Sequence, residues 1–197
     1  MYYGELVCLR ALEPPDLDII LKHWNTWELR RTIGVPIPSS RSSKKEWFDW
    51  ASKTDPWKDG FLTLAIVNKA NDEFLGVARF EDISCPHRRA ELGVSIYDPA
   101  YRSKGYGTDA ARVMLWMGFH ILGLRSIYLD TFADNERAVR AYEKCGFKRV
   151  GLLRKTEFMA GEYHDLLIMD ILREEFMESN PPGTFVGGEI EETRVGS

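Results

Sequence analysis

Hydrophobic and polar positions alternate most regularly over residues 89–97. Two sets of residues take alternate positions there: Ala90, Leu92, Val94 and Ile96 on one side, and Glu91, Gly93, Ser95 and Tyr97 on the other. Successive side chains of a strand point to opposite faces, so this segment predicts a strand with one apolar and one semi-polar face. Before it, the apolar runs 62–67 and 74–80 flank a turn-rich segment and predict a β-hairpin.

Apolar residues recur at helical spacing in three other segments. The first, 16–24, follows Pro14-Pro15, and proline is tolerated in the first turn of a helix. The second is 107–122 and the third is 135–145. These segments predict three helices that are separated by strands and loops.

Four more strands are predicted, at 6–12, 126–132, 148–155 and 163–172, the last two joined by a turn at Ala160-Gly161. In chain order the elements run strand, helix, helix, three strands, helix, strand, helix and two strands. This order predicts a mixed sheet with helices packed on it, in the α+β or α/β class. It fits neither a doubly wound parallel sheet nor an all-β fold.

Segment 25–60 is the hardest to assign. It holds four of the six tryptophans, and Ser43-x-x-Glu46 is a capping-box pattern that predicts a short helix. Aromatic residues near loops either line a pocket or form a small second core, and we favour the second core here.

The length of the chain, 197 residues, indicates one domain with an appendage. We expect a single domain over residues 1–178. Residues 179–197 carry Pro181-Pro182-Gly183 and a run of acids, so we expect them to form a flexible C-terminal tail.

Composition and charge exclude several classes of function. With 26 basic and 30 acidic residues the net charge is -4, which gives no general attraction to nucleic acid or to an anionic membrane. The three cysteines lie far apart, so we expect reduced thiols in a cytoplasmic protein. We expect no export signal or membrane anchor, because the apolar runs are shorter than the ~20 residues that span a bilayer. The four histidines lack metal-ligand spacing, so no metal is expected.

The segment Arg102-Ser103-Lys104-Gly105-Tyr106-Gly107-Thr108 holds the richest candidate chemistry. Its glycines allow a tight turn, and the next helix presents free N–H groups to an anion. Three interpretations compete. The segment is an exposed turn, a diphosphate-binding loop, or the dinucleotide pattern Gly105-x-Gly107-x-x-Ala110 with Asp130 as the ribose acid. The dinucleotide pattern fits poorly, because seven residues separate the predicted strand from the first glycine.

At this point the chain resembles a known family. Arg102-x-x-Gly105-x-Gly107 is similar to the acetyl-CoA pyrophosphate loop of GCN5-related N-acetyltransferases (GNAT). Asn135-x-x-Ala138 and Tyr142-x-x-x-Gly146-Phe147 are similar to two later elements of that family. His87-Arg88-x-Ala90-Glu91 and Gly161-x-Tyr163-x-Asp165 resemble the branch that holds ribosomal-protein N-terminal and spermidine N-acetyltransferases. The resemblance covers residues 5–173 in element order. It implies a twisted, mixed, mostly antiparallel sheet with helices on both faces, split at the strand that binds the cofactor.

The resemblance also implies acetyl-CoA as co-substrate. Its diphosphate would bind the loop residues Arg102, Ser103, Lys104, Gly105, Tyr106, Gly107 and Thr108. The pantetheine arm would pair with the backbone of Val94 and Ile96, as an added strand does. Asn135 and Ala138 would contact the cofactor as well, although an asparagine at this place also caps a helix well.

For catalysis, the resemblance implies that Tyr142 protonates the departing thiolate. Tyr142 also lies on the apolar stripe of its predicted helix, so packing in the core is the competing role. Glu91 is our candidate base for the attacking amine, and a salt bridge with Arg79 or Arg89 is the competing role. We expect Cys145 to pack in the core and not to act as a nucleophile.

The function that follows is direct acetyl transfer from acetyl-CoA to an amine. The branch favours a protein N-terminal α-amine, and a small amine such as a polyamine, an aminosugar or an antibiotic is the second option. Loops at 25–60 and 156–164 would shape the acceptor pocket. Its candidate acids are scattered in sequence and predict no polyamine site: Glu28, Asp49, Asp82, Glu157 and Glu162.

Two functions of different classes compete with acetyl transfer. One is a non-catalytic acyl-CoA sensor that uses the same loop, and the other is a nicotinamide-dependent oxidoreductase. The chain does not reveal the oligomeric state, and a homodimer is one option.

Overall fold

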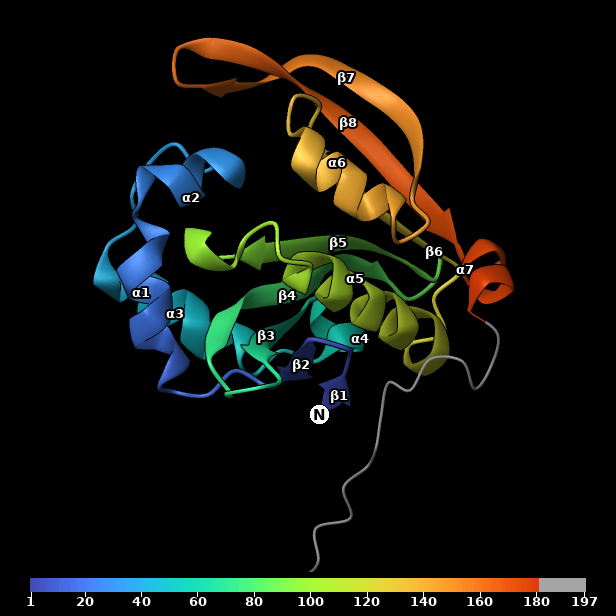
Figure 1. The fold of residues 1–197 in the computed structure, drawn as a ribbon, viewed down its shortest axis with the longest axis horizontal. Helices are drawn as coiled ribbons and strands as arrows, with labels where there is room; N and C mark the ends of the chain where they lie inside the picture. The colour runs from blue at the N-terminus through green and yellow to red at the C-terminus, as the bar shows by residue number, and fades with distance from the viewer. Residues whose placement is uncertain (181–197) are drawn as a thin grey trace, which may run out of the picture.

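One eight-stranded sheet runs through the part of the chain that the computed structural model describes, residues 1–180 (Figure 1). The strands are β1 (Tyr2–Tyr3), β2 (Val7–Arg10), β3 (Leu62–Asn68), β4 (Phe74–Ser84), β5 (Arg89–Ile96), β6 (Ser126–Phe132), β7 (Lys148–Met159) and β8 (Glu162–Leu172). Their order in the sheet is β1-β2-β3-β4-β5-β6-β8-β7. All neighbours are antiparallel except β5 and β6, which are parallel. The mixed, mostly antiparallel sheet is therefore confirmed.

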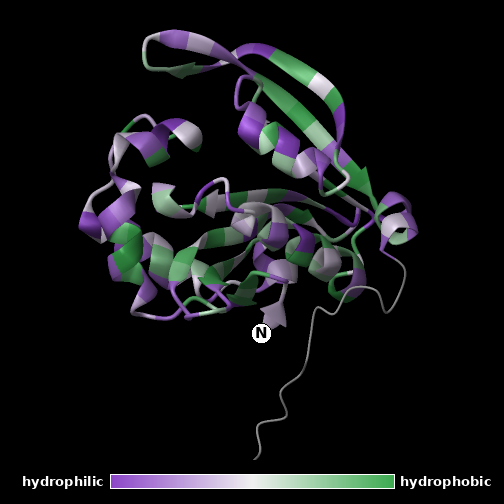
Figure 2. Cartoon of the chain, viewed as in Figure 1, coloured by the Kyte–Doolittle hydropathy of each residue, from purple (hydrophilic) through white to green (hydrophobic). Residues whose placement is uncertain are grey.

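Helices pack on both faces of this sheet. They are α1 (Asp16–Trp24), α2 (Trp27–Thr32), α3 (Arg41–Ala51), α4 (Pro56–Asp59), α5 (Tyr106–Trp116), α6 (Glu136–Glu143) and α7 (Arg173–Ser179), with short helical turns η1 (Pro99–Tyr101) and η2 (Met117–Ile121). One apolar cluster joins α5 to the sheet and includes Val113 and Leu92. A second joins α1 and α3 to the opposite face and includes Ile20, Phe48 and Tyr97. The central strands are accordingly the most hydrophobic part of the chain (Figure 2).

Most predicted elements are confirmed, two differ in their bounds, and the short elements β1, α2 and α4 were not predicted. Helix α3 begins a turn earlier than the Ser43-x-x-Glu46 pattern suggests, because the Ser40 side chain caps it by accepting from the Ser43 N–H at 3.0 Å. Strand β7 continues four residues past the predicted end at 155. Helix α7 was not predicted at all. Residues 181–197 of the predicted tail lie outside the described residues.

The tryptophans of segment 25–60 divide between core and surface. Trp47 stacks on Trp24 in the second cluster, as the core interpretation expects. Trp27, Trp50 and Trp57 are exposed, so that interpretation is wrong for them. Trp27 instead borders a surface pocket.

The N-terminal segment is tied to α5 by one carboxylate. Asp109 is buried and accepts hydrogen bonds from the N–H groups of Glu5, Leu6 and Val7 at 3.1, 2.8 and 3.0 Å. Gly4 allows this approach, because a Cβ there would lie 2.4 Å from Asp109 Oδ2. The contact holds β2 against the first turns of α5, directly after the glycine loop.

The β7–β8 hairpin projects past α6 toward α2 (Figure 1). It carries a bulge at Lys155, whose φ is +51° and whose N–H donates to Asp165 Oδ1 at 2.7 Å. The motif residue Asp165 therefore shapes the hairpin. None of the helices within residues 1–180 has the length and apolar character needed to cross a membrane.

Candidate active site

Strand β5 parts from β6 after three residue pairs, Arg89↔Ser126, Ala90↔Ile127 and Glu91↔Tyr128. Residues 92–96 of β5 then continue without β6 as a partner. On that side the Ile96 carbonyl accepts from Arg102 and the Val94 backbone hydrogen-bonds Tyr142, while β6 pairs with none of these residues. An extended ligand can pair with the backbone groups that remain along such an edge. The structure thus contains the split that the resemblance implies.

The glycine loop turns from β5 into α5. Ser103 and Gly105 both have positive φ, +60° and +92°, and Gly105 caps α5. Among residues 1–180, no protein acceptor lies at the first-turn N–H groups of Tyr106, Gly107 and Thr108. Free N–H groups at a helix N-terminus bind phosphate well. This loop therefore suits the diphosphate of acetyl-CoA.

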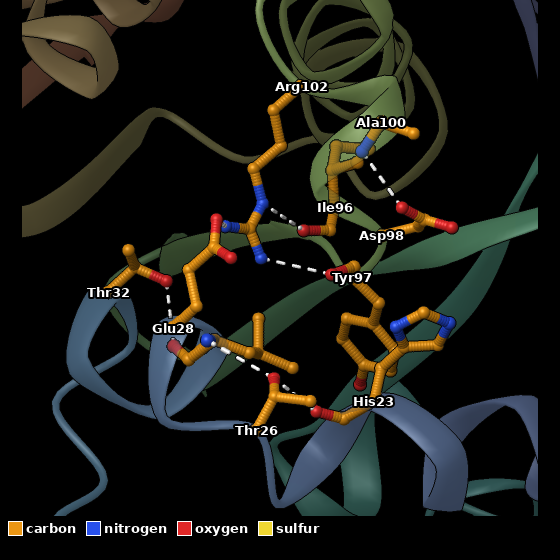
Figure 3. Close-up of polar contacts among 10 residues, drawn as sticks. His23, Thr26, Glu28, Thr32, Ile96, Tyr97, Asp98, Ala100 and Arg102 are labelled. Atoms are coloured by element: carbon orange, nitrogen blue, oxygen red, sulfur yellow. Dashed lines mark hydrogen bonds and ion pairs between the residues drawn. The ribbon is translucent and has the colours of Figure 1, made fainter.

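The Arg102 side chain points toward the backbone of Ile96 and Tyr97 and toward Glu28 (Figure 3). Its Nε donates to the Ile96 carbonyl at 3.1 Å and its Nη2 to the Tyr97 carbonyl at 3.0 Å. Its Nη1 donates to Glu28 Oε1 of α2 at 2.8 Å. With 8% of its side chain exposed, Arg102 holds the end of β5 against α2. The predicted contact with the diphosphate remains untested, and the geometry favours this anchoring role.

A first pocket connects the glycine loop with the free edge of β5. The predicted residues that line it are Val94, Ile96, Arg102, Ser103, Gly105, Gly107, Thr108, Asn135, Ala138 and Tyr142. Lys104 and Tyr106 do not line it. Lys104 is exposed, with its Nζ 5.8 Å from the centre of the Tyr101 ring, and Tyr106 packs on the same ring. The pocket thus collects most of the chain's predicted acetyl-CoA contacts.

Asn135 caps α6, because its side-chain oxygen accepts from the Ala138 N–H at 3.3 Å. It also lines the first pocket, so capping and ligand contact are compatible.

Tyr142 lies on α6, half-buried, where two pockets meet. Its ring packs edge-on against Phe147, with centroids 5.6 Å apart. Burial raises the pKa of the phenol to about 12, and a hydrogen bond with the Val94 backbone offsets this in part. The phenol therefore keeps its proton at neutral pH and is available as a donor.

A second pocket lies on the other side of the split and gathers acids. Glu91 from β5, Asp130 from β6 and Glu157 from β7 line it, together with Arg79 and Tyr142. Burial raises the pKa of Glu91, and the charges of Asp130 and Glu81 raise it further. Burial also raises the pKa of Asp130, as does the charge of Glu157. Carboxylates with raised pKa values in a pocket are candidates for proton transfer.

The second pocket was only partly predictable. Sequence reasoning proposed Glu91 but assigned Asp130 to a ribose contact and treated Glu157 as one of several scattered acids. The spacing of residues on β6 was the signal that could have placed Asp130 beside Glu91. Glu91 pairs with Tyr128, and a side chain two residues further, Asp130, points to the same face.

Cys145 packs in the apolar core, as expected. Cys145 is buried, and burial raises the pKa of its thiol to about 12, so it remains protonated. The described residues 1–180 contain no group of three or more His, Cys, Asp or Glu side chains arranged to hold a metal ion. That the enzyme needs no metal stays a prediction.

Known proteins are similar to this chain in sequence and in fold. Residues 7–148 match the family described as "Acetyltransferase (GNAT) domain". An uncharacterized N-acetyltransferase of Bacillus subtilis, YokL, is 28% identical over 88% of this chain and 93% of its own length. Spermidine N(1)-acetyltransferase of Escherichia coli K12 is 34% identical over 59% of this chain and 63% of its own length.

Among solved structures, the spermidine N-acetyltransferase of Vibrio cholerae in complex with CoA and spermine superposes with a TM-score of 0.79 at 26% identity. That match covers 88% of this chain and 99% of the Vibrio chain. The match to the family model covers more than half of the chain, and the split sheet and glycine loop agree with it. This chain belongs to the GNAT family and is an acetyl-CoA-dependent N-acetyltransferase.

Proposed function

We propose that this enzyme acetylates a primary amine of a small polycation, and that its substrate is a polyamine. The observation that carries the proposal is the acidic second pocket. Glu91, Asp130 and Glu157 line it, and Glu81 lies close enough to raise the pKa of two of them. Arg79 is the single Lys or Arg side chain among the described residues that line it, so acids outnumber bases. A cleft of one charge concentrates ligands of the opposite charge.

The two proposed catalytic side chains approach the split from opposite faces of the sheet. Leu92 belongs to the cluster under α5, so its neighbour Glu91 faces the other way. Tyr142 comes from α6, which packs on the α5 side. An amine can therefore enter from the Glu91 face while the thiol leaves toward Tyr142. This arrangement suits a direct attack on the thioester.

On the acceptor side, the amine must lose a proton to become a nucleophile, because an alkylamine has a pKa of about 10. Glu91 accepts that proton directly or through a water molecule. The raised pKa of Glu91 makes it a stronger base than an exposed glutamate.

On the donor side, acetyl-CoA supplies the thioester when it is bound in the first pocket. The backbone groups of Val94 and Ile96, on the edge of β5 that β6 leaves, are the candidates for holding the pantetheine arm and the carbonyl oxygen. The Tyr142 phenol donates its proton to the departing sulfur. The loop N–H groups of residues 106–108 hold the diphosphate.

The comparisons support a polyamine more than a protein N-terminus. Two relatives, from Escherichia coli and Vibrio cholerae, are spermidine N-acetyltransferases, and the Vibrio structure contains spermine. A protein α-amine brings a single charge to the pocket, whereas a polyamine brings several and uses the additional acids. The small-amine option of the sequence analysis is therefore our main proposal, in place of the protein N-terminus.

The test is a series of acceptors of increasing charge, with CoA release as the readout. We compare kcat/KM for a monoamine, a diamine and spermidine in wild type, in Asp130→Asn and in the control Asp82→Asn. Asp82 is exposed and pairs with Arg89 at 3.0 Å. We expect Asp130→Asn to lower kcat/KM roughly tenfold for spermidine, equivalent to about 1.4 kcal/mol, and less for the monoamine. Equal losses for all acceptors, or a preference for the monoamine in wild type, contradict the proposal.

A further inference from the structure

Among residues 1–180, the lining of the acidic pocket includes one cation, Arg79, and close contacts fix its position. Arg79 on β4 lies across β5 at Gly93, its partner in the sheet. A Cβ at Gly93 would lie 2.8 Å from Arg79 Cζ and 3.0 Å from its Nε. The Arg79 Nε lies 2.8 Å from Glu81 Oε1. Glycine at position 93 thus leaves the space that the guanidinium occupies.

The Arg79–Glu81 contact is an ion pair and not a well-aligned hydrogen bond. Nε is buried from solvent, and within residues 1–180 its N–H is not aligned with any acceptor. A hydrogen bond to Glu81 therefore does not explain why an arginine occupies this position. The effect of its charge on the other groups of the pocket explains it better.

Arg79 interacts electrostatically with groups from every element around it. Glu81 lies on its own strand. The other titratable groups that face it or share its pocket are Lys44 of α3, Glu91 of β5, Tyr97 directly after β5, Asp130 of β6, Glu157 of β7 and Tyr142 of α6. Its charge lowers the pKa of Glu91 and of Asp130, opposing the burial that raises both. Lys44 is the other cation of this group, and it lies outside the pocket, over the rings of Trp24 and Trp47.

We propose that Arg79 is a positioning residue for acetyl transfer, held over Gly93 so that its charge keeps Glu91 and Asp130 ionised. Resting on the proposed role of Glu91, this inference adds a residue that acts on the acceptor through two carboxylates of the pocket. Ionised Glu91 can take the proton of the amine, and ionised Asp130 can bind a second ammonium group. Without Arg79, mutual repulsion and burial would protonate a carboxylate of the pocket at higher pH.

The test compares the pH dependence of kcat/KM for spermidine in wild type, Arg79→Met and Arg79→Lys. In Arg79→Met we expect the acidic limb to move up by on the order of one pH unit, so that the deficit is largest below neutrality and disappears in alkaline buffer. Arg79→Lys keeps a charge and should restore the wild-type limb to a large extent. A loss of equal size at every pH would mean a structural role and would overturn the inference.

Two further variants complete the test. Gly93→Ala keeps the arginine but pushes its guanidinium aside, so we expect the same upward shift even if Arg79→Met does not fold. An unmoved limb in Gly93→Ala overturns the inference. Arg89→Met is the matched control, because Arg89 also pairs with an acid of β4 but lies outside the pocket. If wild type acetylates no amine at any pH, the proposed function fails, whereas an active wild type with unmoved variants defeats only the role of Arg79.

Discussion

Replacing Asp109 by alanine tests how the fold supports the glycine loop. Its carboxylate accepts from the N–H groups of Glu5, Leu6 and Val7. Leu6 in turn touches the loop, because a Cβ at Gly105 would lie 3.1 Å from Leu6 Cδ1. Asp109→Ala therefore removes three hydrogen bonds and loosens the segment that packs on the loop.

The expected loss follows from the burial of the three donors. The Val7 N–H is buried, and a buried donor that loses a charged acceptor costs about 2 kcal/mol. The N–H groups of Glu5 and Leu6 are only partly buried and can bind water, so each costs about 0.5–1 kcal/mol. The free energy of unfolding should fall by about 3–4 kcal/mol, which lowers Tm by roughly 6–16 °C in a domain of this size.

Urea unfolding of Asp109→Ala against wild type measures this loss directly. The control is Asp18→Ala, which removes an exposed carboxylate that pairs with Arg41 at 3.0 Å. The control should change the free energy of unfolding by less than about 0.5 kcal/mol. We also expect Asp109→Ala to weaken acetyl-CoA binding in calorimetry. A loss of stability below about 1 kcal/mol would refute the reasoning, since an unmade bond to a charged acceptor exceeds that value.

Four more changes test other parts of the site. Tyr142→Phe keeps the packing on Phe147 but removes the proton donor. We expect kcat to fall roughly 100- to 10,000-fold while the acetyl-CoA affinity measured by calorimetry stays unchanged. A kcat within about threefold of wild type would rule out Tyr142 as the general acid. Arg102→Lys loses the forked contact to two carbonyls and should raise the Kd for acetyl-CoA, whereas an unaltered Kd would argue against anchoring. Lys44 is buried, and burial lowers its pKa to about 8. Between about pH 8 and 10 the free energy of unfolding of wild type should therefore rise relative to that of Lys44→Met, by on the order of 2–3 kcal/mol in urea titrations. A fall over this pH range would contradict the prediction. Cys145→Ala should keep kcat within about twofold, because the thiol stays protonated, and a large loss would reopen a nucleophilic role.

Local sequence patterns predicted the positions of β5 and of the glycine loop well. The alternation on β5 and the glycines of the loop act through backbone conformation over a few residues, so spacing alone reveals them. The inward turn of Arg102 could not be predicted this way. It depends on Glu28, which lies 74 residues earlier in the chain and comes close only because α2 packs over the end of β5.

The acceptor half depends on contacts between strands that are distant in sequence. Glu91, Asp130 and Glu157 come from three strands, and only the parallel register of β5 with β6 and the antiparallel register of β8 with its neighbours bring them together. Sequence spacing therefore made these acids look scattered. The resemblance supplied the fold, but the choice of acceptor required the three-dimensional arrangement.

The most direct test of the account compares two acceptors under identical conditions. Purified full-length protein with acetyl-CoA is given spermidine or a short peptide with a free N-terminus, and CoA release and the mass of each product are measured. The account predicts acetylated spermidine, with a kcat/KM for spermidine well above that for the peptide. Acetylation of the peptide alone, or faster than that of spermidine, would contradict the claim that the acidic pocket selects a small polycation.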